Sequence, residues 1–84
     1  MDQSLKPHFD VDTRLDITRD YCPMTYVRVR LALDRMDGGK ILFVTLRGDE
    51  PRRNVPRSAS EQGHAVLAQV DDPDGISRLW IRKG

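Results

Sequence analysis

The chain contains 84 residues, 38% of them hydrophobic and 32% charged, and its 14 Lys and Arg residues nearly balance its 13 Asp and Glu residues. This length accommodates one domain with a modest core, and the composition excludes an intrinsically disordered chain. The formal net charge of +1 argues against a strongly cationic nucleic-acid binder.

Membrane and export signals are missing from the sequence. No stretch approaches the roughly 20 apolar residues that cross a bilayer, and residues 1–7 lack the apolar core of a secretory signal. We therefore expect a cytoplasmic protein with no membrane partner. The chain has one cysteine, Cys22, so its fold does not rely on an internal disulfide.

The sequence predicts a flexible leader over residues 1–11 and a single domain over residues 12–84. Pro7 disrupts regular structure in the leader, and no periodicity begins before Asp12. From Asp12 to Ile17 polar and apolar residues alternate, which predicts a half-buried strand with Leu15 and Ile17 facing the core.

A helix is predicted from Pro23 to Met36, a segment rich in helix formers and without glycine. Proline suits the first helical turn, where its missing N–H group removes no hydrogen bond, and Gly38 and Gly39 end the helix. Its apolar residues form two stripes at helical spacing, and the sequence leaves open which is buried more deeply. The wider stripe contains Tyr26, Val29, Ala32, Leu33 and Met36, and the narrower one contains Val27 and Leu31.

A strand and a second helix are predicted next. Residues 40–47 form a β-branched and aromatic run that is typical of a central strand. A turn is expected at residues 48–51 and a helix at residues 52–62. Because proline cannot donate a helical hydrogen bond, this helix either starts near Pro56 or is kinked there.

Two further strands complete the predicted fold, over residues 65–70 and 76–82, joined by a turn rich in Asp, Pro and Gly. Leu79 and Ile81 share one face of the last strand, whereas Trp80 lies on the uncovered face near Phe43. The predicted order is therefore β-α-β-α-β-β. We expect an α/β (α+β) two-layer sandwich, a four-stranded mixed sheet with two helices on one face.

Cys22 is the strongest candidate for chemistry. It follows the first predicted strand and immediately precedes Pro23, which puts it at the N-cap or in the first turn of the first helix. Free N–H groups and the positive end of the helix dipole favour a thiolate at such a position. The alternative interpretation is a buried cysteine that acts as a small hydrophobic residue.

The stretch from Leu15 to Thr25 resembles the Cys-Pro-x-Pro signature of the TusA/SirA-like sulfurtransferase family. The similarity continues through Gly48-Asp49-Glu50-Pro51, Asn54-Val55-Pro56 and Gly63-His64, and it covers about residues 12–83. It implies the same β-α-β-α-β-β fold and a sulfur carrier that holds a persulfide on Cys22. It also implies protein partners, namely a cysteine desulfurase or other persulfide donor and a downstream sulfur acceptor, and no cofactor of the carrier's own.

Two positions depart from the family pattern. Thr25 stands in place of the second proline of the motif, and Arg19 in place of the usual glycine three residues before the cysteine. Neither change removes the nucleophile, and the Thr25 hydroxyl is placed to hydrogen-bond the sulfur or a backbone group. We interpret the chain as a divergent member of the family.

Charged residues are candidates for supporting roles around Cys22. Five arginines would either stabilise a persulfide anion and dock an acidic partner, or remain solvated surface charges. They are Arg19, Arg28, Arg52, Arg53 and Arg57. Arg53 is favoured because it falls in the segment that resembles the start of the family's second helix. Asp49 is interpreted as a turn former and cap, or as part of a partner-binding edge.

Other functions are less well supported by the sequence. His8, His64 and Cys22 do not have the spacing of zinc ligands, so we expect no metal site. His64 is expected at the junction between the second helix and the third strand. A non-catalytic protein-interaction or redox-sensing module on the same fold is the main alternative. RNA binding is disfavoured by the near-neutral charge and the lack of clustered aromatic residues.

Overall fold

The computed structural model describes residues 10–20 and 24–84 of the chain. Six elements follow one another in the predicted order. They are β1 (Thr13–Asp16), α1 (Met24–Asp34), β2 (Ile41–Arg47), α2 (Asp49–Glu61), β3 (Ala65–Asp71) and β4 (Ile76–Arg82).

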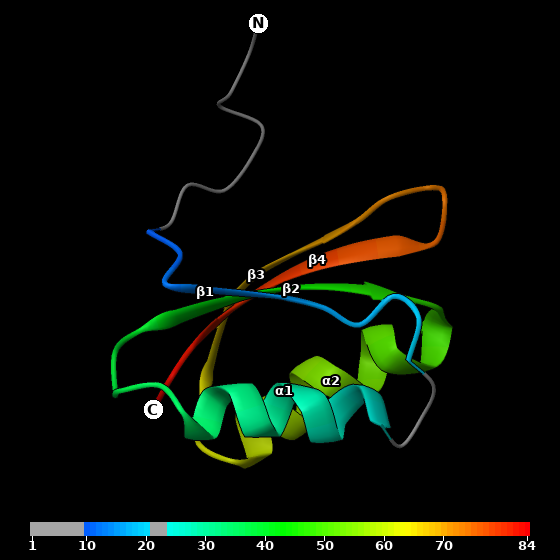
Figure 1. Ribbon diagram of the computed structural model, residues 1–84. Helices are drawn as coiled ribbons and strands as arrows, with labels where there is room; N and C mark the ends of the chain where they lie inside the picture. The colour runs from blue at the N-terminus through cyan, green and yellow to red at the C-terminus, as the bar shows by residue number, and fades with distance from the viewer. Residues whose placement is uncertain (1–9, 21–23) are drawn as a thin grey trace, which may run out of the picture.

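The four strands form one mixed sheet with the order β1-β2-β4-β3. β1 runs parallel to β2, whereas β4 runs antiparallel to both β2 and β3. Figure 1 shows α1 and α2 together on one face of this sheet, so the predicted two-layer sandwich is confirmed. Because parallel strands need a crossover connection, the chain passes through α1 between β1 and β2. The carboxyl ends of these two strands therefore lie at the same edge of the sheet.

The core lies between the sheet and the two helices. Alternate residues of the central strands point toward the helices, as the period of a pleated strand requires. Ten residues make up this core, each at most 1% exposed: Ile17, Val29, Leu33, Leu42, Val44, Leu46, Val55, Ala59, Leu79 and Ile81. Because each large side chain of this set stabilises the fold by roughly 1.5–3 kcal/mol on burial, the core holds the sandwich together without a crosslink.

The structure shows which apolar stripe of α1 is buried. Val29 and Leu33 of the wider stripe are fully buried, and Tyr26, Ala32 and Met36 pack against the core cluster. Val27 and Leu31 of the narrower stripe are 40% and 51% exposed. The helix ends at Asp34, earlier than the predicted Met36, because the last amides bond three residues back, Met36 N to Leu33 O at 3.0 Å. The predicted start at Pro23 lies outside the described residues.

The second helix begins at Asp49, so the predicted turn at residues 48–51 and start at Arg52 are wrong. Between β2 and α2 the chain changes direction at the single residue Gly48, whose φ of 102° favours glycine. Pro51 fits the first helical turn, where its missing donor removes no hydrogen bond. Pro56 lies inside the helix, and the helix continues through it to Glu61.

The face of the sheet away from the helices carries an aromatic pair. The ring centroids of Phe43 and Trp80 lie 5.0 Å apart with an interplanar angle of 54°, as the sequence predicted. The Arg14 guanidinium lies 5.4 Å from the centroid of the Phe43 ring. Cross-strand contacts of this kind stabilise a sheet, so side chains on the face away from the helices also hold β1, β2 and β4 together.

None of the helices described over residues 10–20 and 24–84 is long and apolar enough to cross a membrane.

Candidate functional site

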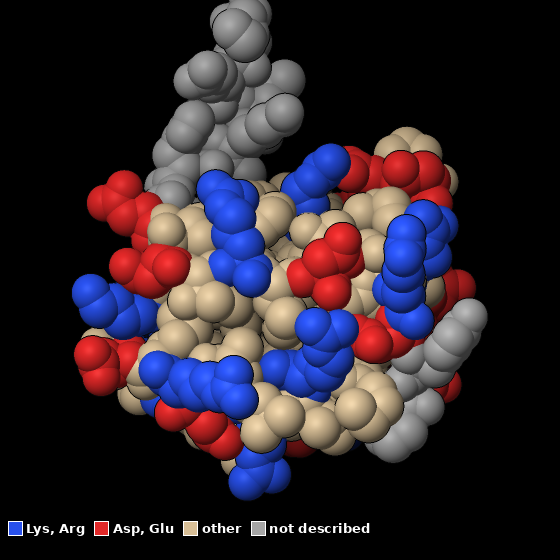
Figure 2. Space-filling model, viewed as in Figure 1, with Lys and Arg blue, Asp and Glu red and all other residues tan. Residues whose placement is uncertain are grey.

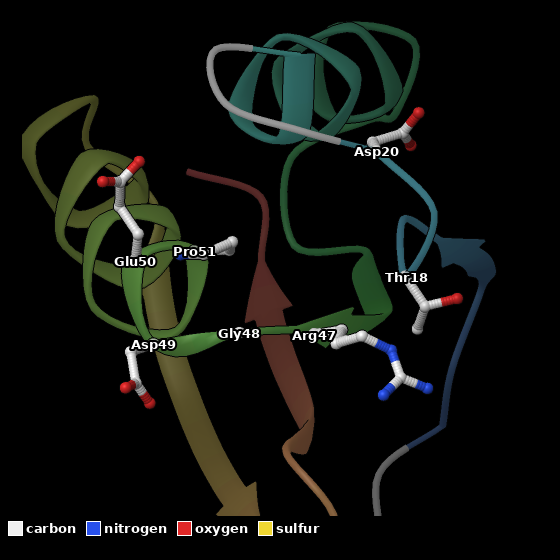
Figure 3. Close-up of a pocket in the computed structure, with 7 residues that line it drawn as sticks. All are labelled: Thr18, Asp20, Arg47, Gly48, Asp49, Glu50 and Pro51. Carbon is white, nitrogen blue, oxygen red and sulfur yellow. The ribbon is translucent and has the colours of Figure 1, made fainter.

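An open pocket lies at the edge of the sheet where β1 and β2 end and where α1 and α2 begin. Its volume is about 390 Å³. The lining comes from the β1–α1 loop and from the β2–α2 junction, two segments far apart in the sequence (Figure 3): Thr18, Asp20, Arg47, Gly48, Asp49, Glu50 and Pro51. The edge outside the carboxyl ends of parallel strands is a common location for functional sites.

Hydrogen bonds fix the β1–α1 loop on one side of this pocket. Ile17 N donates to Thr45 O at 2.9 Å, which extends the pairing of β1 with β2, and Asp20 N donates to Ile17 O at 3.1 Å. The Asp16 carboxylate accepts from both Thr18 N at 2.9 Å and Thr18 Oγ1 at 2.7 Å. Because these bonds favour the charged form, they lower the pKa of Asp16. These bonds tie the loop to β2 and to its own backbone up to Asp20.

An ion pair joins this loop to the first helix. Arg28 Nη1 lies 2.6 Å from Asp20 Oδ2, and both side chains are partly exposed. Asp20 precedes residue 21, and Met24 is the first described residue of α1. The pair therefore connects the two ends of the chain between which Cys22 lies in the sequence.

Arg47 is the cationic residue of the pocket lining. It is the last residue of β2 and is exposed. Its side chain points toward Thr18 across the pocket (Figure 3), and among the described residues it forms no ion pair. Sequence reasoning missed Thr18, Asp20 and Arg47. The signal that identifies them is their position, since they follow or end the two strands that the topology makes parallel.

The predicted site residues Cys22 and Pro23 lie outside the described residues. Thr25, the second residue of α1, is described and only 3% exposed, so its side chain faces the interior. Asp49 lines the pocket and is the first residue of α2, where a carboxylate interacts favourably with the helix dipole. The predicted role of Asp49 as a turn former and cap is wrong, because the N-cap is Gly48 and no side chain caps the helix. Arg53 lies one turn further along α2, is exposed, and is not part of the pocket lining.

Three of the other candidate arginines lie beside carboxylates. Besides the pair of Arg28 with Asp20, Arg52 Nη2 lies 2.7 Å from Asp49 Oδ1 and Arg57 Nε lies 3.5 Å from Glu61 Oε2. Exposed pairs of this kind contribute roughly 0–1 kcal/mol each. Arg19 is exposed in the β1–α1 loop. These side chains therefore do not converge on one point of the pocket.

His64 lies at the junction between α2 and β3, as the sequence predicted. Its backbone N–H group donates to Ala59 O at 3.0 Å, and its Nδ1 accepts from Gly84 N at 3.0 Å. Burial, followed by the nearby Lys83, lowers the pKa of His64. Within residues 10–20 and 24–84, no three His, Cys, Asp or Glu residues are grouped closely enough to hold a metal ion.

Fold and site define a small two-layer sandwich with an open, charged pocket between the β1–α1 loop and the β2–α2 junction. The sequence pattern of the family described as sulfurtransferase TusA matches residues 13–83. The chain belongs to this family, as the resemblance of its Cys-Pro segment predicted.

Similar proteins agree with this assignment. The chain is 33% identical over 73 residues to the putative sulfur carrier protein YrkI of Bacillus subtilis, covering 87% of this chain and 96% of that protein. It is 31% identical over 75 residues to the sulfur carrier protein TusA of Pseudomonas putida, covering 89% and 92%. A putative sulfur carrier protein of Archaeoglobus fulgidus is 41% identical over 54 residues, and this match covers 64% of the chain and 61% of that protein.

A solved structure supports the fold. The crystal structure of a SirA-like protein from Desulfitobacterium hafniense superposes with a TM-score of 0.73 and 22% identity. The match covers 86% of this chain and 97% of that one. It shows that the two proteins share the sandwich.

Proposed function

We propose that the chain is a sulfur carrier that accepts a sulfane sulfur on Cys22 from a protein persulfide and passes it to a second protein. The observation that carries this proposal is the pocket at the ends of β1 and β2. Its lining residue Asp20 stands two positions before Cys22, and α1 starts two positions after it. Membership of a sulfurtransferase family supplies the chemistry that such a site would perform.

The transfer step needs no external oxidant. The Cys22 thiolate attacks the outer sulfur of a donor persulfide, so that a new S–S bond forms on Cys22 as the donor's S–S bond breaks. The electron pair leaves on the inner sulfur of the donor as a thiolate, and the proton of the transferred outer sulfur moves to it to give a thiol. The product is a persulfide anion on Cys22. Attack by an acceptor thiolate on its outer sulfur then repeats the same exchange in the forward direction.

The neighbouring residues are proposed to support this step. Pro23 directly precedes α1 in the sequence, and the free N–H groups of the first turn of that helix are proposed to favour the anion on sulfur. Thr25 is buried in that turn and is proposed to orient the backbone around the sulfur. Asp49 at the pocket and the exposed Arg53 are proposed to contact the partner, and Arg53 would pair with an acidic surface. The first donor to test is a cysteine desulfurase.

The test is the intact mass of the protein after incubation with a cysteine desulfurase, free cysteine and pyridoxal phosphate. We expect a gain of about 32 Da per sulfur in the wild type, removed by a reductant and absent in Cys22→Ser. Alkylation with iodoacetamide under the same conditions serves as the control for thiol access. A thiol that neither gains sulfur nor reacts with iodoacetamide would refute the proposal and favour a non-catalytic interaction module.

A further inference from the structure

Helix α1 exposes an apolar stripe to solvent. Met24 is 49% exposed, Val27 40% and Leu31 51%. Within the part of the chain that the structure describes, these are the large hydrophobic residues with exposed side chains. Packing in the core accounts for the apolar residues of the wider stripe of this helix, but it does not account for these three apolar residues. We call them the α1 stripe.

The three side chains lie on one face of the helix. Their spacings of three and four residues correspond to about one helical turn each, so they stand in a row. This row points away from Val29 and Leu33, which are fully buried against the sheet. It begins at Met24, two residues after Cys22 in the sequence, and continues for two turns. A protein bound to the α1 stripe would therefore cover the surface next to the proposed sulfur site.

Arginines outnumber acidic residues along the border of the α1 stripe. Arg28 follows Met24 by four residues, Arg30 follows Val27 by three, and Arg35 follows Leu31 by four, so each apolar residue has an arginine beside it. Asp34, three residues after Leu31, is the acidic residue of the helix beside the stripe, and Arg28 pairs with Asp20. Neither Arg30 nor Arg35 forms an ion pair among the described residues. Figure 2, viewed with α1 in front, shows tan surface in this region with blue and some red side chains around it.

We propose that the α1 stripe is the docking surface for the protein that delivers sulfur to Cys22. The partner it fits has an apolar patch bordered by Asp and Glu side chains, close to its own persulfide cysteine. This inference rests on the proposed function. Transfer requires the two sulfur atoms to meet, so the donor has to lie against the chain beside residue 22. An apolar centre with a rim of opposite charge supplies the burial and orientation that such a contact needs.

Comparing two sulfur donors distinguishes an effect on protein docking from an effect on the reactivity of Cys22. A desulfurase persulfide has to dock, whereas inorganic hydrogen disulfide needs no protein contact: the Cys22 thiolate takes its outer sulfur and hydrosulfide leaves. The variants are Val27→Glu and Leu31→Glu. Each puts a carboxylate in the stripe at an exposed helical position, where glutamate is tolerated. Ser60→Glu is the matched control, because it adds the same charge at an exposed position near the end of α2.

Mass spectrometry then gives the initial rate of persulfide formation on Cys22 for each protein and donor. We expect the desulfurase rate to fall about tenfold or more in both stripe variants, the change in affinity expected for a lost central contact. It should be unchanged in Ser60→Glu, and all rates with hydrogen disulfide should match the wild type.

The other possible results contradict either the docking surface or the carrier function. Equal desulfurase rates in all variants, or a wild type loaded only by hydrogen disulfide, would overturn the docking surface and leave the carrier function intact. No loading from either donor would refute the carrier function itself. A dimer of the wild type that Leu31→Glu abolishes would show that a second copy covers the stripe, which also overturns the inference.

Discussion

The Asp20 carboxylate accepts a hydrogen bond from Arg28 Nη1 at 2.6 Å, and this pair fastens the β1–α1 loop to the second turn of α1. Both charges lie in the sequence close to Cys22, Asp20 before it and Arg28 after it. The pair therefore links the backbone on the two sides of the proposed sulfur site. A positive charge near a thiolate favours it and a negative charge disfavours it, so the two residues would affect a nearby thiolate in opposite directions.

Replacing either partner of this pair should change the reactivity of Cys22. Asp20→Asn removes a negative charge and should speed alkylation by iodoacetamide at pH 7 about twofold to fivefold, whereas Arg28→Gln should slow it by a similar factor. Thermal unfolding should shift little, because exposed ion pairs contribute roughly 0–1 kcal/mol. If both variants are alkylated at the rate of the wild type, neither charge acts on the thiol.

The two stripes of α1 should differ sharply in their contribution to stability. Leu33 is fully buried, whereas Leu31 is 51% exposed. Leu33→Ala should reduce the free energy of unfolding by about 2–5 kcal/mol through lost burial and a cavity. Leu31→Ala should change it by about 0.5 kcal/mol or less. Urea denaturation of the two variants measures this difference, and a large loss in Leu31→Ala would mean that this residue is buried in solution.

A hydrogen bond from Gln69 compensates for the proline inside α2. Pro56 cannot donate to the carbonyl of Arg52, and Gln69 Nε2 lies 3.3 Å from that oxygen. Gln69→Ala should therefore destabilise the protein by about 1 kcal/mol. In a Pro56→Ala background, where an amide can donate to Arg52 O, the same change should have less effect. A double-mutant cycle in urea tests this coupling, and additive effects would contradict it.

Stability should fall as His64 becomes protonated. Burial and Lys83 lower the pKa of His64 in the folded protein, so the unfolded chain binds the proton at higher pH. The neutral ring therefore stabilises the fold above the unfolded pKa of about 6.5, and this contribution is lost as the pH falls through the folded value. Protonation would also remove the acceptor of the Gly84 N–H group.

Melting temperatures between pH 8 and pH 5 measure this effect. The wild type should lose stability on acidification, and His64→Gln should lose less over the same range. Parallel curves for the two proteins would show that another group is responsible. Asp16 and Asp71, whose pKa values are also lowered by hydrogen bonds, contribute only at lower pH, below about 4.

Much of this protein could be predicted from local patterns. Alternation in β1 and β4, the apolar run of β2 and the glycines after α1 gave the correct order of six elements. The Cys22-Pro23 pair pointed to the family that the matching sequence pattern then confirmed. Such predictions succeed because the periods of strands and helices, and the backbone requirements of glycine and proline, act between residues close in the chain.

Only the tertiary structure decided the rest. The sequence contains two apolar stripes on α1, and packing against the sheet buried Val29 and Leu33 while leaving Val27 and Leu31 exposed. Pro56 suggested a break in α2, but Gln69 from β3 supplies the hydrogen bond that the helix lacks. The pocket brings Thr18 and Arg47 together because β1 and β2 are parallel. Each of these features depends on contacts between residues distant in the chain, and neither hydrophobic period nor local backbone preference specifies those contacts.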